Sequence, residues 1–201
     1  MAGSDVQATF VVSAAADPNG ISESAQVANN ANLVIGGALA SGGAVTFDNP
    51  RNVTITSGGN DSGITFTVTG TDASGAALAE TITGGNAGIA TGTSIFATVT
   101  QITAVGDPAG TVTAGSGATI QATIFAGRCR LKGLYLVSTA TGGTISFRNG
   151  SVTGTALLKY NTPSSVGSEY PDVPGDGMVF SSGAYITYSS VNATSATIFY
   201  A

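Results

Sequence analysis

Apolar and hydroxyl-bearing residues alternate along much of this chain, most clearly over Pro50–Ala114. The residues at 64–69 read Ile-Thr-Phe-Thr-Val-Thr, and those at 53–56 read Val-Thr-Ile-Thr. Because successive side chains of a β-strand point to opposite sides, this period of two predicts strands with one buried and one solvated face. Glycine-rich stretches interrupt the alternation and predict short turns. They lie at 58–63, 70–75 and 84–88.

The second half of the chain repeats this order of strand, glycine turn and strand. Its candidate strands lie at 120–126, 128–132, 134–138, 143–148, 156–160, 178–180, 184–188 and 195–200. Short strands that recur about every 8 to 12 residues are typical of sandwiches and barrels. We therefore expect an all-β fold of two β-sandwich or jelly-roll-like domains with short glycine turns.

The composition changes near Gly115–Gly117, and this change predicts a domain boundary. The expected parts are an N-terminal arm or extended segment at 1–30, a first β domain at 31–116 and a second β domain at 117–201. A chain of 201 residues is long enough for each domain to bury a modest core.

The N-terminal segment allows two interpretations. Residues 4–16 form either an arm or one strand, which the turn signal at Asp17–Gly20 ends. Such a strand runs through Ala8, Phe10 and Val12. Over 22–33 we favour extended structure over a helix, because three asparagines in this stretch are poor helix formers.

Charged residues are scarce and unevenly placed. They make up 8% of the chain, where about 25% is usual, and such a surface suits assembly better than a free enzyme. Residues 1–127 hold eight carboxylates and one cation, whereas residues 128–201 hold five cations and three carboxylates. A sequence pI near 4.3 argues against nucleic-acid binding, which needs clustered cations over a wide face.

The sequence offers little for catalysis or for cofactor binding. Histidine is absent, and Cys129 is the only cysteine, which excludes histidine-based nucleophilic devices and multi-thiolate metal sites. We expect Cys129 to be buried and inert. Carboxylates are a further possibility, but most lie in turns, where a short acceptor serves the backbone. The candidate carboxylates are Asp61, Asp72, Glu80, Asp107, Glu169, Asp172 and Asp176. Glu80 is the exception, because it is expected in a strand, on the wet face.

We therefore expect no enzyme activity, no catalytic residue, no metal and no cofactor. The turn at 172–177 has two carboxylates but lacks the ligand spacing of a calcium loop, so a plain Pro-Gly turn is favoured. The first residues lack a signal peptide's cationic region, and no apolar run reaches the length of a membrane span. Neither a membrane nor a nucleic acid is an expected partner.

Three cations form the one candidate interface. Alternation places Arg128, Arg130 and Lys132 on one face of one strand, where like charges repel unless acids oppose them. The structural interpretation is a solvated face with carboxylates on the neighbouring strand. The functional interpretation is docking onto an acidic neighbour, such as the acidic first domain of another copy.

Several segments resemble a known protein family. The run from Gly36 to Asp72 contains Val-Thr-Phe-Asp-Asn-Pro-Arg-Asn-Val-Thr-Ile-Thr-Ser at 45–57, and Glu-Thr-Ile-Thr-Gly-Gly-Asn-Ala-Gly follows at 80–88. These stretches resemble segments of structural proteins of tailed bacteriophages, notably phages of aquatic bacteria. The motifs near the C-terminus are similar to small β domains of phage capsid and tail proteins. They lie at 133–138, 174–180 and 196–200.

The resemblance implies a Gly/Thr-rich virion protein of the head-decoration or cement type. The expected function is to coat or cement the capsid through non-covalent contacts, with the phage major capsid protein and copies of itself, in a homotrimer, as partners. The expected location is the capsid surface of the virion, after synthesis in the host cytoplasm. The alternatives are a tail component, either tube, adaptor or receptor-binding tip, and a carbohydrate-active module.

Overall fold

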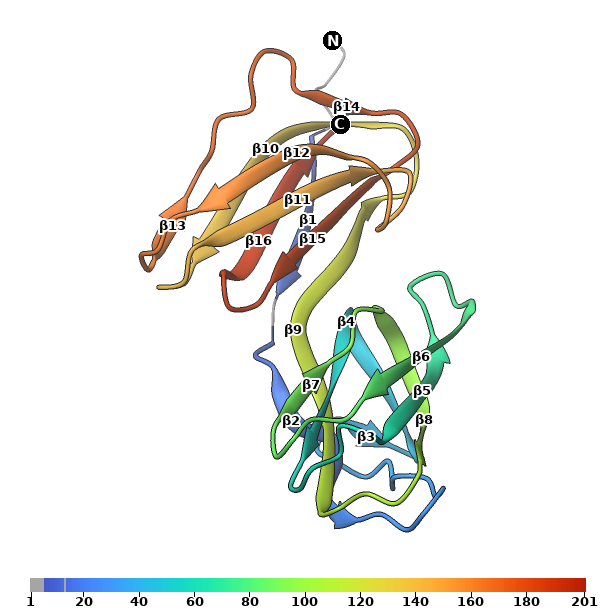
Figure 1. Cartoon of the computed structure of the whole chain (residues 1–201). Helices are drawn as coiled ribbons and strands as arrows, with labels where there is room; N and C mark the ends of the chain where they lie inside the picture. The colour runs from blue at the N-terminus through green and yellow to red at the C-terminus, as the bar shows by residue number, and fades with distance from the viewer. Residues whose placement is uncertain (1–5, 13) are drawn as a thin grey trace. The chain divides into compact units, whose positions relative to one another are not determined.

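The structure is a computed structural model that describes residues 6–12 and 14–201. The chain is all-β, as the alternation predicted, and its described residues contain no helix (Figure 1). The first eight strands are β1 (Gln7–Val12), β2 (Asp17–Gln26), β3 (Ala40–Ser41), β4 (Ala44–Ser57), β5 (Thr65–Thr71), β6 (Ala77–Thr83), β7 (Ile89–Thr91) and β8 (Phe96–Val105). The others are β9 (Thr111–Phe125), β10 (Cys129–Ser138), β11 (Gly143–Asn149), β12 (Ala156–Thr162), β13 (Gly167–Glu169), β14 (Met178–Phe180), β15 (Ala184–Ser189) and β16 (Ala193–Tyr200).

The chain forms two compact units that are not two consecutive halves. One unit is Ala16–Ala118, and the other joins Thr119–Ala201 to the N-terminal residues up to Ala15. The acidic unit is our name for Ala16–Ala118, because it holds seven of the carboxylates and only one cation. We call the other the terminal unit. The acidic unit is therefore inserted between β1 and the rest of the terminal unit.

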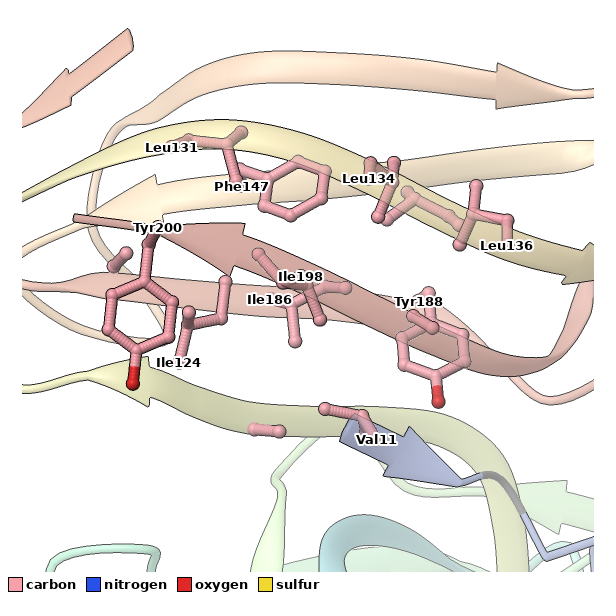
Figure 2. Packing of buried hydrophobic residues seen from close by; sticks show 14 of the residues in the cluster. Val11, Ile124, Leu131, Leu134, Leu136, Phe147, Ile186, Tyr188, Ile198 and Tyr200 are labelled. Atoms are coloured by element: carbon pink, nitrogen blue, oxygen red, sulfur yellow. The ribbon is translucent and has the colours of Figure 1, made fainter. Parts of the chain in front are cut away.

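The terminal unit is a two-layer sandwich. One sheet has the order β1-β16-β10-β13, with β14 also paired to β10, and the other layer has the order β12-β11-β15-β9. Leu134 and Leu136 from the first layer meet Phe147 and Ile186 from the second in one buried core (Figure 2). All four side chains are at most 2% exposed. The alternation of Leu-Tyr-Leu-Val in β10 and Ala-Thr-Ile-Phe in β16 puts one residue in two into this core.

The acidic unit holds a second core, built from β2 to β8 and the first part of β9. Its strands follow the order β2, β9, β4, β8, β5 and β6, with β3 and β7 on β4. Phe66 and Val68 of β5 are fully buried, whereas Thr65 and Thr67 are half-buried and Thr69 is exposed. The predicted alternation of Ile64–Thr69 is thus confirmed, with Ile64 itself packed against the core from outside the strand.

The N-terminal segment 1–30 is divided between the two units. β1 pairs with β16 along its whole length, from Gln7 opposite Tyr200 to Val12 opposite Ser195. The strand interpretation of this stretch therefore holds for 7–12, although the buried residue is Val11, and Phe10 and Val12 point outward. Residues 1–5 and 13 lie outside the described residues.

The strand β2 lies where a turn was predicted at Asp17–Gly20 and where a helix was the alternative to extended structure at 22–33. It begins at Asp17 and continues through Gly20, with irregular pairing to β9 over this stretch. A side chain on Gly20 would collide with Asp17 and Leu39, so the glycine serves close packing instead of a tight turn. The extended structure favoured over 22–33 is confirmed for the part inside β2.

The predicted break at Gly115–Gly117 lies inside one long strand. β9 runs without interruption from Thr111 to Phe125 and pairs with β2 in the acidic unit and with β15 in the terminal unit. A Cβ on Gly115 would overlap Asp17 O, and one on Gly117 would overlap the Asn52 side chain. These glycines therefore mark close approach of neighbouring chain segments. The units nevertheless divide only one residue after Gly117.

The buried position of β1 leads to a test with two adjacent valines. Val11 is 2% exposed and Val12 is 45% exposed. Val11→Ala removes two buried methyl groups, and we expect it to lower the free energy of unfolding of the terminal unit by about 2 kcal/mol. Val12→Ala is the control and should change it by less than about 0.5 kcal/mol. Calorimetry or denaturant unfolding followed by circular dichroism measures both; equal effects would show that β1 is an arm.

Candidate functional site

The terminal unit has an apolar surface on the outer side of the sheet β1-β16-β10. The register aligns three rows of outward residues across these strands. They are Ala8, Phe199 and Gly133; Phe10, Thr197 and Tyr135; and Val12, Ser195 and Val137. The intervening residues of the same strands fill the core, so this sheet carries apolar side chains on both sides.

The outward aromatic side chains are well exposed. The exposed fraction is 64% for Phe10, 40% for Tyr135 and 68% for Tyr170. Phe199 is half-buried. We call Phe10, Tyr135, Tyr170 and Phe199, with Val12 and Val137, the aromatic face. Tyrosine and phenylalanine are enriched at the centre of protein interfaces, because each buries a large area at a small cost in rotamer entropy.

Tyr170 reaches the aromatic face from the segment after β13. Its ring centroid lies 6.4 Å from that of Phe199, and the two rings are tilted by 51°. A Cβ on Gly133 would lie 3.3 Å from Tyr170 Oη and 3.5 Å from Phe199, so this glycine leaves room for both rings. The face is thus assembled from strands at both ends of the sequence and from a connecting segment.

The predicted basic residues lie at one end of the aromatic face. Arg130 is outward and half-buried beside β14, Lys132 is exposed, and Arg128 is exposed just before β10 begins. Lys132 is the extra residue of a β-bulge, because Leu131 pairs with Tyr200 and Gly133 with Phe199. We call Arg128, Arg130 and Lys132 the basic end.

Two of these cations donate hydrogen bonds to backbone carbonyls and not to carboxylates. Lys132 Nζ donates to Asp176 O at 2.7 Å, and Arg130 donates to Gly177 O at 3.4 Å. Within the described residues, no carboxylate forms an ion pair with the three cations. Glu169 of β13 lies opposite Leu136 on a strand paired with β10, but it forms no ion pair with these cations. The carbonyls belong to the Pro174–Gly177 turn, closed by a hydrogen bond from Gly177 N–H to Pro174 O at 3.2 Å, as the Pro-Gly interpretation predicted.

Cys129 is buried in the core of the terminal unit, as expected. Burial raises the pKa of its thiol, because desolvation disfavours the thiolate. Its neighbours Arg128 and Arg130 point to the other side of the strand. The thiol is therefore protonated near neutral pH and is not a nucleophile.

Three of the candidate carboxylates hold turns together. Ser74 Oγ and the backbone N–H groups of Ser74 and Ala76 donate to Asp72 Oδ1, and these hydrogen bonds lower the pKa of Asp72. Glu80 Oε1 accepts the backbone N–H of Thr93 at 2.7 Å. Asp61 is fully buried, and its Oδ1 accepts the Ala109 N–H at 2.7 Å. Asp72 closes its own turn and Asp61 ties two connecting segments together, as their turn positions predicted, whereas Glu80 of β6 fixes the segment at Thr93.

The other carboxylates are scattered over both units. Glu169 Oε2 accepts a hydrogen bond from Tyr160 at 3.4 Å, and burial together with Glu169 raises the pKa of Tyr160. Asp107 is exposed before Pro108, and Asp172 and Asp176 are exposed around the Pro174–Gly177 turn.

Neither a metal cluster nor a membrane helix occurs in the residues that the structure describes. Over 6–12 and 14–201, no three His, Cys, Asp or Glu side chains gather closely enough to hold a metal ion. No helix in that same part of the chain has the length and hydropathy of a membrane span. Comparison with protein-family models, with curated proteins and with solved structures finds no match to the chain.

Sequence reasoning located the basic end but missed the aromatic face. The signal was present in β10, where Leu134–Val137 is apolar at every position and so predicts apolar residues on both sides of the sheet. Phe10 and Tyr135 lie 125 positions apart in the sequence, and only the register brings them into one row. Tyr170 carried no signal, because it belongs to no strand.

The turn at the basic end gives a matched pair of glycine variants. Gly177 has φ +91°, and a Cβ there would overlap Leu131 O, whereas Gly175 has φ +61° and nothing within 4 Å. We expect Gly175→Ala to cost about 1 kcal/mol in unfolding free energy, from backbone strain alone. Gly177→Ala should cost at least about twice as much, because β10 must also move. Denaturant titration of both variants checks this, and equal costs would contradict the described position of the turn.

Proposed function

We propose that the chain is a structural virion protein of a bacteriophage that decorates or cements the capsid through non-covalent contacts. The aromatic face carries this proposal. A contiguous apolar sheet surface that a chain leaves exposed is typical of a protein that docks on another protein. Its basic end adds electrostatic selection of an acidic partner surface.

The composition supports an adhesive role for the whole chain. Only 8% of the residues are charged, so a neighbouring protein meets few groups that are costly to desolvate. Two sandwich units with rigid cores present these surfaces with little loss of conformational entropy on binding. The likeness of Gly36–Asp72 and of the C-terminal motifs to phage structural proteins agrees with such a role.

The energetic effect of such a coat follows from mass action. A protein that binds only the assembled shell stabilises the shell by RT ln(1 + [L]/Kd), where [L] is its free concentration. At about 100 times Kd this amounts to roughly 2.7 kcal/mol for each site. Many modest contacts distributed over a shell therefore suffice, and no single residue needs to dominate.

The copy number in purified particles tests the location. A head-coating protein occupies symmetry-related positions over the shell, and we expect on the order of hundreds of copies per particle. Quantitative mass spectrometry of purified virions, with the major capsid protein as internal standard, gives the number. Only a few copies would assign the chain to the tail, and its absence from particles would overturn the proposal.

The aromatic face should determine occupancy of the particle. We expect Phe10→Ser combined with Tyr135→Ser to reduce binding to particles about tenfold or more, the typical effect of removing central aromatic anchors. Leu157→Ser is the control, because Leu157 is 42% exposed on β12 in the other layer, close to the 40% of Tyr135. A sedimentation assay with particles that lack the chain measures both. If the double variant and the control bind alike, the aromatic face is not the attachment surface.

A further inference from the structure

The two units differ sharply in charge, and the basic end belongs to the terminal unit. The acidic unit holds seven carboxylates and one cation, whereas residues 119–201 hold five cations and three carboxylates. The one cation of the acidic unit, Arg51, is 2% exposed and lies 3.8 Å from Asp48. The acidic unit thus presents Glu23, Asp48 and Asp107 to solvent, without an exposed cation among its described residues.

Two of the exposed acids of that unit lie on β2 and on the turn that contacts its end. Glu23 and Asp107 are both exposed. Gln26 Nε2 donates to Pro108 O at 3.1 Å, and this bond holds the end of β2 to the turn that carries Asp107. Val105, two residues before Asp107, is 51% exposed, so exposed apolar surface lies near Asp107.

We propose that the aromatic face of one copy binds the acidic unit of a second copy, so that copies of this chain join head to tail. The basic end of the first copy then opposes Glu23 and Asp107 of the second copy. This inference rests on the proposed function in assigning the aromatic face to protein contact, and it names the partner of that face.

Charge selects this contact over a face-to-face dimer. In a two-fold contact each aromatic face would meet its own copy, and the three outward rows hold no carboxylate. The only acids beside the basic end are Asp172 and Asp176 at the Pro174–Gly177 turn, and they form no ion pair with it among the described residues. The acidic unit supplies the opposite charge, and like-charge contacts are costly at an interface. A buried aromatic residue covers roughly 150 to 250 Å². The exposed rings therefore supply a good part of the roughly 800 Å² per partner of a specific interface.

A head-to-tail contact uses two different surfaces of each copy. Such a contact closes into a ring when the rotation between copies is a simple fraction of a turn, and otherwise it continues as a filament. The expected trimer is one such ring. Each copy has one aromatic face and one acidic unit. If one copy has a damaged aromatic face and another has a damaged acidic unit, the intact aromatic face of the second can still bind the intact acidic unit of the first.

This property gives the decisive experiment. In one full-length variant, Phe10→Ser with Tyr135→Ser removes the aromatic anchors; in the other, Glu23→Lys with Asp107→Lys reverses the opposing charges. The wild-type chain should exceed the monomer mass in sedimentation velocity, and less so at about 0.5 M than at about 0.05 M NaCl, because salt screens the charges. Each variant alone should associate about tenfold or more weakly. Their equimolar mixture should form a complex of two chains.

Several results would overturn the inference. They are a wild-type chain that stays monomeric, a Glu23→Lys, Asp107→Lys variant that associates like the wild type, or a mixture that forms no complex. Circular dichroism melting confirms that the variants fold. If a double variant does not fold, the single variants Tyr170→Ser, for the aromatic face, and Glu23→Gln, for the acidic unit, take the place of the two double variants. A chain that is monomeric in solution but abundant on particles would leave the proposed function standing, whereas a chain that assembles but is absent from particles would refute only the proposed function.

Discussion

The terminal unit depends on the pairing of β1, β16 and β10 into a sheet with apolar residues on both sides. One side closes the core through Leu134 and Ile198, and the chain leaves the other side, with Phe10 and Tyr135, exposed. The hydrophobic effect drives burial of both sides, but a two-layer sandwich covers only one. The apolar surface that stays exposed can therefore contribute free energy when it is buried against a partner.

This pairing also determines how the chain is divided. β1 reaches its place beside β16 only if the chain leaves the terminal unit, builds the acidic unit and returns along β9. β9 runs unbroken through the return, and Gly115 and Gly117 lie where neighbouring segments approach too closely for a Cβ. The glycines that suggested a flexible boundary are therefore required by packing. The same route separates the charges, because the inserted unit holds most of the carboxylates.

Local pattern was enough to predict the all-β class, most strand positions and the buried Cys129, because a period of two is a property of neighbouring residues. It could not predict that β1 pairs with β16, since that partner lies at the other end of the chain. The bulge at Lys132 was also beyond local pattern, because an inserted residue is defined only relative to the partner strand. The basic residues were found from their spacing, whereas the aromatic face needed the register of three strands.

The positions of the charged groups agree with the proposed binding role. A catalytic carboxylate needs a reacting group within hydrogen-bond reach, but Asp72 and Glu80 already accept backbone N–H groups of their own loops. The cations differ, because Lys132 and Arg130 donate to carbonyls and form no ion pair among the described residues. They lie beside exposed aromatic rings, where desolvation by a partner would strengthen their attraction to an acid. An apolar surface with one charged end therefore selects its partner by the sign of the partner's charge as well as by its shape.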